Sequence, residues 1–263
     1  MKRRSFVKTS VMGTATALTA ALKTSAANPP KQQQEYYELR IYTLKDAVQQ
    51  KLVEDYYQNA AIPALNRLGV KNVGVFTELK PAGQTRLFVI ACYKNIEHFA
   101  AVNAGLDNDA AYQQQAAAYL QAPAAAPAYE RIESSLLKAF AHMPHMQAPA
   151  ATPRIFELRQ YQSASEAAGK KKIEMFNDEG EIDIFKRLGF KPVFFGETVI
   201  GGDRPNLTYM VTFDDMAAHD AHWKSFGSDP EWKKISTVPG YADALLVSKI
   251  TPTFLVPVSY SQV

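Results

Sequence analysis

An acid, a base and a phenol recur at alternate positions in two short segments of the sequence. They are Glu38, Arg40 and Tyr42 in the first segment, and Glu157, Arg159 and Tyr161 in the second. Because side chains alternate between the two faces of a β-strand, each set would share one face of a strand. Arginine pairs with carboxylates and stacks on flat rings, so these residues are our candidate pocket for a small anionic or planar ligand.

The opposite face of the first segment carries Tyr37, Leu39 and Ile41, and we expect this apolar face to pack against helices. We expect the polar faces to enclose a partly polar space between two sheets, where Glu and Arg pair to offset their loss of solvation. Two alternatives stay open. The polar sets could lie on a solvated sheet face, or they could form ion pairs that only fix how two halves of the molecule meet.

Two of the five histidines, His219 and His222, lie three residues apart in a segment expected to be helical. They could share a metal ion or one face of a haem, although a solvated helix face would have the same spacing. Neither a His-Glu-x-x-His pattern nor a cysteine-rich spacing occurs, so a zinc site is not indicated. Phosphate-loop, dinucleotide and catalytic-serine motifs are also absent from the sequence, which therefore requires no cofactor.

The two polar sets belong to an internal repeat. The run from Tyr37 to Tyr42 recurs as Phe156 to Tyr161, 119 residues later, and Leu65 to Lys71 matches Phe185 to Lys191 at a spacing of 120. Matches at a nearly constant spacing over such a length indicate a duplicated unit.

Each copy reads as strand, helix, strand, strand, helix, strand, the βαββαβ order of ferredoxin-like folds, so we expect an α+β fold. Gly69 and Gly189 mark the end of the first helix in each copy. The expected strands cover residues 36–43, 72–78, 86–93 and 132–139, then 154–161, 192–199, 206–213 and 244–250. The expected helices cover residues 46–68, 95–120, 165–188 and 215–236.

The segments outside the two copies have no helix or strand periodicity. We expect a linker over residues 28–35, the first copy over 36–140, a second linker over 141–153, the second copy over 154–255 and a C-terminal tail over 256–263.

The N-terminus has the features of an export signal. Lys2, Arg3 and Arg4 precede Phe6, a short apolar stretch follows, and Ala26-Ala27 forms a small-residue cleavage site. The twin arginine resembles a bacterial twin-arginine (Tat) signal, so we expect residues 1–27 to be removed and the protein to be periplasmic. The apolar stretch is shorter than the roughly 20 residues that span a bilayer. A signal for the general secretion route, or an uncleaved tail, is the alternative.

The charge balance excludes two classes of partner. The chain has 29 Lys and Arg against 26 Asp and Glu, but five of the basic residues and no acidic residue lie in residues 1–27. The remaining chain is slightly acidic, whereas nucleic acids and anionic lipids require clustered basic residues. We expect no integral membrane segment after signal removal. A homodimer formed through an exposed sheet edge is compatible with the sequence.

Several motifs together resemble the NIPSNAP family. Glu-Leu-Arg-x-Tyr opens each copy, and Ser228 to Lys233 contains an Asp-Pro-x-Trp motif. The resemblance carries the family's motif onto Glu157, Arg159, Tyr161, Asp229 and Trp232, with Glu38, Arg40 and Tyr42 as weaker counterparts. The first copy departs from the pattern, because Asp109-Ala110-Ala111-Tyr112 stands in place of Asp-Pro-x-Trp.

The resemblance implies a dimeric α+β barrel, an architecture shared with small haem-binding proteins and cofactor-free monooxygenases. In this chain the duplication could form that barrel within one molecule. We therefore expect an exported protein that binds a small ligand in the barrel between the two repeats. One alternative is an oxidoreductase, either a cofactor-free oxygenase or a haem protein with His219 or His222 as axial ligand. The other alternative is a structural module without a ligand.

Overall fold

The computed structural model describes residues 33–263, so the signal expected over residues 1–27 lies outside the described residues. The linker expected over 28–35 is described only from residue 33. Within this described part, no helix combines the length and the apolar character that crossing a membrane requires.

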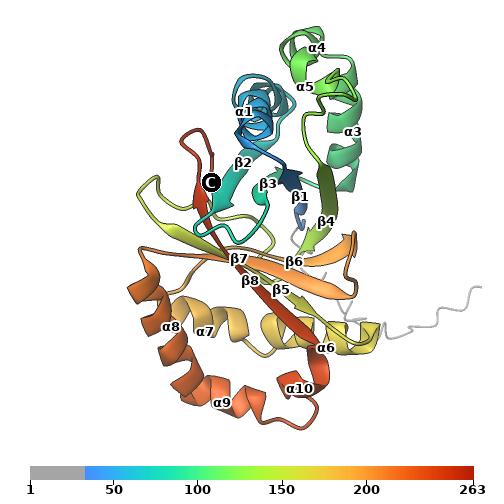
Figure 1. Ribbon diagram of the computed structural model, residues 1–263. Helices are drawn as coiled ribbons and strands as arrows, with labels where there is room; N and C mark the ends of the chain where they lie inside the picture. The colour runs from blue at the N-terminus through green and yellow to red at the C-terminus, as the bar shows by residue number, and fades with distance from the viewer. Residues whose placement is uncertain (1–32) are drawn as a thin grey trace, which may run out of the picture. The chain divides into compact units, whose positions relative to one another are not determined.

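Antiparallel strands form a closed barrel within the single chain (Figure 1) in the order β1-β3-β2-β8-β5-β7-β6-β4. The two repeats join at the β2–β8 and β4–β6 pairs, so each repeat supplies four neighbouring strands. The prediction of an α+β fold with an intramolecular barrel is confirmed. The strands are β1 (Tyr36–Leu44), β2 (Lys71–Glu78), β3 (Thr85–Tyr93), β4 (Arg131–Ala139), β5 (Ile155–Gln162), β6 (Lys191–Ile200), β7 (Asn206–Phe213) and β8 (Lys249–Pro257).

Helices cover the outside of each four-stranded half (Figure 1). The helix expected over residues 165–188 is in fact two helices: the first ends at Asn177, and Gly180, with a positive φ of 88°, precedes the second. The first repeat carries α1 (Ala47–Tyr56), the π-helical turn η1 (Tyr57–Ala61), α2 (Ile62–Arg67), α3 (Ile96–Asp107), α4 (Ala110–Gln115) and α5 (Ala117–Leu120). The second carries α6 (Glu166–Asn177), α7 (Glu181–Arg187), α8 (Met216–Ser228), α9 (Pro230–Ser236) and α10 (Asp243–Leu246).

The interior of the barrel is apolar, which reverses the expected orientation of the first strand of each repeat. Tyr37 and Leu39 point into the barrel, where they pack against rings such as Phe76 and Phe156. Tyr42 and Tyr161 lie on the outer face, in the clusters between the sheet and the helices. The interior of an eight-stranded barrel can be filled completely by side chains, and here it is occupied by close apolar packing where the sequence predicted a polar ligand pocket.

The last strand begins later than the sequence suggested. The expected strand over residues 244–250 is replaced by α10, and β8 extends from Lys249 to Pro257. Asp243 of α10 pairs with Lys172 of α6 at 3.2 Å, and Leu246 packs against Met175. These contacts hold the segment as a helix. The residues after β8 then continue along β2, since Val258 N donates to Val75 O at 3.1 Å.

Candidate functional site

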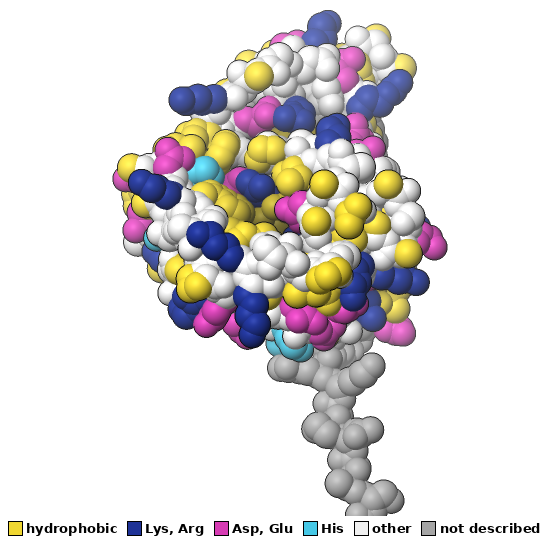
Figure 2. All heavy atoms as spheres, turned by 90° about the horizontal axis from the view of Figure 1, so that it is seen from below, with side chains coloured by type: hydrophobic (Ala, Val, Ile, Leu, Met, Phe, Trp, Pro, Cys, Tyr) yellow, Lys and Arg dark blue, Asp and Glu magenta, His cyan; other side chains and the backbone are white. Residues whose placement is uncertain are grey.

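The face that carries α8, α9 and α10 is hollowed. Figure 2 shows a hollow rimmed by hydrophobic side chains, with basic and histidine side chains inside it or at its margin. Charged residues of the second repeat lie between β5 and these helices, and they form our candidate site.

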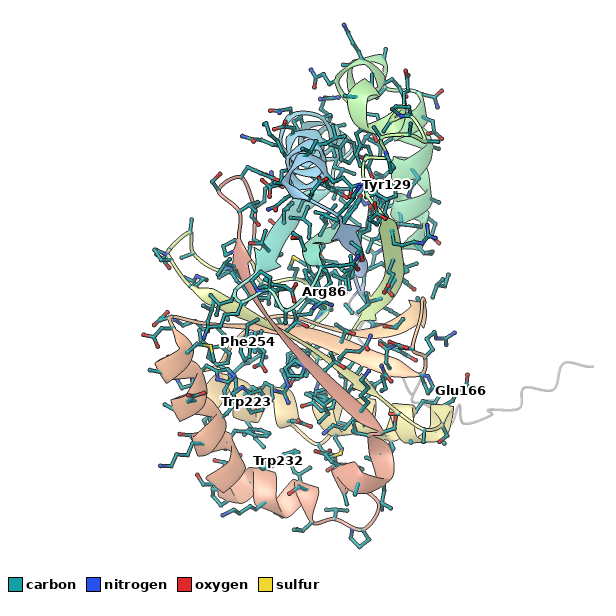
Figure 3. All side chains as sticks on the ribbon, in the orientation of Figure 1. Arg86, Tyr129, Glu166, Trp223, Trp232 and Phe254 are labelled. Carbon is teal, nitrogen blue, oxygen red and sulfur yellow. The ribbon has the colours of Figure 1, made fainter. Side chains whose placement is uncertain are left out.

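Glu157 of β5 is fully buried and accepts hydrogen bonds from two side chains. Its Oε1 accepts a hydrogen bond from Arg159 Nη1 at 2.7 Å, and its Oε2 accepts one from Trp223 Nε1 at 2.9 Å. Trp223 comes from α8 (Figure 3), so the carboxylate ties the sheet to the helix. A carboxylate buried in this way needs such donors to offset the loss of water.

Arg159 is the part of this cluster that remains accessible, with 16% of its side chain exposed. Its guanidinium lies 4.4 Å from the centre of the Trp223 ring, and its Nη2 donates to the Tyr161 hydroxyl at 3.1 Å. Its Nε is buried and has no hydrogen-bond partner among residues 33–263. Burial acts to lower the pKa of Arg159, but Tyr209, Tyr161 and Glu157 outweigh it and the pKa is raised. The guanidinium therefore stays charged, with one donor unused.

His219 lies beside the same carboxylate. Its Nε2 is 3.3 Å from Glu157 Oε2, and its Nδ1 is 2.8 Å from Asp220 Oδ1. The His219 ring also meets the Phe254 ring edge-on at 5.0 Å. Both ring nitrogens thus face carboxylates, an arrangement that favours a role in proton transfer over a bond to iron.

His222 packs over Phe190 and Phe213, at ring distances of 5.5 and 5.8 Å, and its Nδ1 is buried. Nε2 of His219, like Nδ1 of His222, is buried without a hydrogen-bond partner among residues 33–263, and the rings of both histidines pack against Phe213. In the part of the chain that the structure describes, no group of three or more His, Cys, Asp and Glu side chains could hold a metal ion.

A second buried charge pair adjoins the site and was not recognised from the sequence. Lys172 of α6 is almost fully buried, and its Nζ lies 3.1 Å from Glu181 Oε2 and 5.2 Å from the Trp232 ring centre. In the sequence, the only indication is that Lys172 falls on the apolar face of a helix. A single lysine in a helix is usually exposed to solvent, so this position did not suggest a buried charge.

The first repeat keeps the same ion pair but surrounds it with different side chains. Arg40 Nε donates to Glu38 Oε1 at 2.7 Å. Over this pair lies a cluster of phenols in which the Tyr42 hydroxyl bonds those of Tyr57 and Tyr119 at 2.8 and 3.0 Å. The remaining cavity of about 20 Å³ has room for about one water molecule. Both arginines are partly exposed, with 29% of the Arg40 side chain and 16% of the Arg159 side chain accessible. The two sets differ in that Arg159 has a buried donor without a partner among residues 33–263, whereas Arg40 has none.

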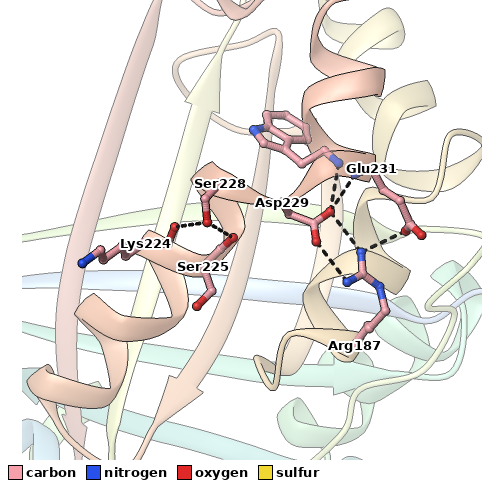
Figure 4. Close-up of polar contacts among 7 residues, drawn as sticks. Arg187, Lys224, Ser225, Ser228, Asp229 and Glu231 are labelled. Carbon is pink, nitrogen blue, oxygen red and sulfur yellow. Dashed lines mark hydrogen bonds and ion pairs between the residues drawn. The ribbon is translucent and has the colours of Figure 1, made fainter.

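The family-motif residues Asp229 and Trp232 organise the end of α8 and the start of α9 (Figure 4). Asp229 accepts hydrogen bonds from the backbone N–H groups of Glu231 and Trp232 at 3.0 and 3.1 Å, which caps α9. It also forms a bidentate ion pair with Arg187, whose Nη1 and Nη2 each lie 3.0 Å from one carboxylate oxygen. The Trp232 ring packs on Phe226 at 4.5 Å. These residues stabilise the helices that border the site.

We expect Asp229→Asn to destabilise the protein at neutral pH and to have less effect in acid. The Arg187 guanidinium and the two backbone donors hold the pKa of Asp229 below its usual value. The stability from this carboxylate is therefore present above the unfolded pKa of about 3.9 and is lost as pH falls through the lower folded pKa. Asparagine still caps a helix, so the variant removes mainly the ion pair.

Urea unfolding between pH 7 and pH 2 measures this difference. Asp214→Asn is the control, because its ion pair with Lys191 is exposed and contributes little. If the difference in the free energy of unfolding between wild type and Asp229→Asn stayed the same in acid, the stabilising role of the Asp229 carboxylate would be contradicted.

Comparisons with known proteins agree with the repeat and the fold. The NIPSNAP family model matches residues 37–144 and 156–262. No curated protein matches the chain. A candidate monooxygenase from Fusobacterium nucleatum is 13% identical with a TM-score of 0.57, over 86% of this chain and 93% of its own.

Two further solved structures have the same fold. A candidate monooxygenase from Lactobacillus acidophilus is 11% identical with a TM-score of 0.56, over 85% of this chain and 94% of its own. An anthrone oxidase-like protein is 11% identical with a TM-score of 0.52, over 86% of this chain and 92% of its own. At these identities the likeness concerns the architecture alone.

Proposed function

The chain belongs to the NIPSNAP family, and we propose that it binds a small planar molecule at Arg159 of the second repeat. The observation that carries the proposal is the buried Nε of Arg159, a charged donor without a partner among the described residues. Leaving such a donor unpaired costs free energy, and a ligand oxygen would satisfy it.

The surroundings of Arg159 favour a flat, acidic ligand. Trp223 and Tyr161 supply ring faces, and the guanidinium supplies a charge that pairs with a carboxylate or phenolate. Glu157 already uses another donor of Arg159 and fixes its orientation, so the free donor is held in place before a ligand arrives.

Aromatic carboxylates such as benzoate and 2-naphthoate test the proposal. The two tryptophans of the chain, Trp223 and Trp232, both border the site, so intrinsic fluorescence reports binding. We expect Arg159→Gln to weaken binding by about 10- to 100-fold, the effect of losing a charged hydrogen bond. Arg40→Gln, at the equivalent position in the first repeat, where the arginine has no buried unpaired donor among the described residues, should leave affinity unchanged.

Two results would count against the site. If Arg40→Gln and Arg159→Gln changed the affinity for the aromatic carboxylate equally, the ligand would not bind specifically at Arg159. If both substitutions lowered stability and no aromatic carboxylate or phenol bound, the ion pairs would be structural only.

A cofactor-free oxygenase is the second candidate, and the contact between His219 and the buried Glu157 favours it. This pair could remove a proton from a phenol or an activated methylene group. With anthrone as probe, the methylene would become a carbonyl, one atom of O₂ entering the product and the other leaving as water. Oxygen uptake that falls by about 100-fold or more in His219→Ala, but not in His222→Ala, would support it. Absence of uptake would exclude this substrate.

We also propose that residues 1–27 direct export to the periplasm. The order of twin arginine, apolar stretch and small-residue cleavage site supports this. Replacing Arg3 and Arg4 by lysine should leave a longer precursor in the cytoplasm, as fractionation and intact mass would reveal. A periplasmic product that still begins at Met1 would contradict cleavage after Ala27.

A further inference from the structure

A cavity of about 430 Å³ lies where the β2–β3 hairpin of the first repeat meets β8 and α8 of the second. We propose that this cavity receives an apolar chain on the same ligand whose oxygen meets Arg159, so that the ligand is an amphiphilic aromatic acid or phenol. The inference rests on the proposed function and adds the class of ligand to it.

The walls of the cavity are largely apolar and come from both repeats. Leu79 and Ala82 belong to the hairpin of the first repeat, and Met216, Pro252 and Phe254 belong to the second. A backbone hydrogen bond of 2.9 Å from Leu79 N to Phe254 O joins the two sides. The volume lies within the range of small-molecule sites, which are mostly apolar with a few polar groups.

The cavity is next to the polar site. Phe254 is the strand partner of Glu157, and Pro252 is the partner of Arg159, in the β5–β8 pairing. Paired residues lie about 5 Å apart, so these two walls of the cavity touch the polar cluster. Met216 precedes His219 by one turn of α8. In Figure 3, Phe254 lies between Arg86 of the first repeat and Trp223 of the second.

The charges at the rim agree with an acidic amphiphile. Arg86 is neutralised by Glu78, at 2.5 Å between Nη2 and Oε1. Lys80 lines the cavity and has no ion-pair partner among residues 33–263. An apolar chain would thus lie between the cationic Arg159 and Lys80, and a second acidic group could reach the latter.

Benzoate, 4-propylbenzoate and 4-hexylbenzoate test the inference by isothermal titration calorimetry on the full mature chain. The three compounds share a head group and differ only in the length of an apolar chain. Affinity should rise by up to about fourfold for each added methylene group, the gain expected for burying it from water. The slope of affinity against chain length reports the cavity, and the affinity of benzoate itself reports the Arg159 site.

Ala82→Phe fills the cavity from the hairpin and should abolish the slope while leaving benzoate affinity unchanged. Gly202→Phe is the matched control on the β6–β7 hairpin, where nothing lies within 4 Å of an added Cβ atom. A slope that survives Ala82→Phe, or that Gly202→Phe removes equally, overturns the inference. Arg159→Gln should weaken all three compounds in parallel. A normal slope with no effect of Arg159→Gln would uphold the cavity and reject Arg159, and no binding by any compound would reject both.

Discussion

Lys172→Val is expected to destabilise the protein by about 3–5 kcal/mol at neutral pH. Lys172 is 1% exposed, and its ammonium is the cation paired with the buried Glu181. Removing one partner of a buried ion pair leaves the other charge without compensation in the interior, which costs about this amount. Urea unfolding followed by circular dichroism measures the loss.

The equivalent positions in the first repeat suggest a double variant that should restore stability. Lys172 lies seven residues after the cap Ser165, and the corresponding residue after Asp46 is Val53, which is fully buried. Glu181 lies eight residues before Gly189, as Ala61 does before Gly69. The double variant Lys172→Val/Glu181→Ala should therefore recover most of the lost stability, because well-packed apolar residues can replace a buried pair.

The pH dependence gives an independent check. Burial raises the pKa of Glu181, and without Lys172 nothing comparable stabilises the ionised form. The folded single variant then binds more protons than the unfolded chain, so its stability falls as pH rises above the unfolded pKa. Lys171→Leu, which removes a solvent-exposed ion pair from the same helix, should have a much smaller effect at every pH. Equal losses in the two variants would show that Lys172 is not a buried charge.

Phe185→Ala is expected to cost about 3–5 kcal/mol, the range for removing a phenylalanine ring from a core. Phe185 is fully buried and packs against Phe190, Trp223 and Phe226 at ring distances of 4.7, 5.6 and 4.8 Å. Because Trp223 holds the carboxylate of Glu157, the cavity would loosen the site as well as the fold. Chemical denaturation measures the first effect, and tryptophan fluorescence of the folded variant measures the second.

Phe185→Leu is the matched control, since Leu65 occupies the equivalent position in the first repeat. It removes less volume and should cost clearly less than the alanine variant. A loss below about 1 kcal/mol for Phe185→Ala would mean that neighbouring rings fill the space and that Trp223 does not depend on it.

The repeat and its strand order were predictable because they depend on local patterns. The run from Tyr37 to Tyr42 and its copy alternate cleanly, and Gly69 and Gly189 adopt the positive φ values, 85° and 87°, that helix ends favour. The helix break at Gly180 carried a similar signal in Asp178-Glu179-Gly180, but the apolar periodicity runs through it and hides it.

The side of the sheet on which the site lies could not be predicted from one strand. Alternation shows that Glu38 and Leu39 face opposite ways, but it does not show which way is inside. The neighbouring strands do not help, since β7 is buried along its whole length and both faces of β3 are apolar. The answer depends on barrel closure, a property of strands far apart in sequence.

The arginine with the unpaired donor could not be identified from the sequence either, because both repeats carry the same Glu-Leu-Arg pattern. The difference between Arg40 and Arg159 arises from residues on the helices. Tyr57 and Tyr119 fill the space in the first repeat, whereas α8 in the second brings Trp223 and His219 to the carboxylate. The surroundings of the shared motif therefore depend on η1 and α5 in the first repeat and on α8 in the second.

Closure of the barrel by one chain has a consequence for how such a protein can change. In a barrel assembled from two identical chains, every substitution appears twice, so a residue that improves binding but weakens packing harms both halves. In this chain each substitution appears once. The first half, with its cluster of phenols, can supply stability, and the second half can keep a buried lysine and an arginine whose Nε has no partner among residues 33–263, features that cost stability where they occur. Duplication within one polypeptide thus lets the two halves of the barrel diverge independently.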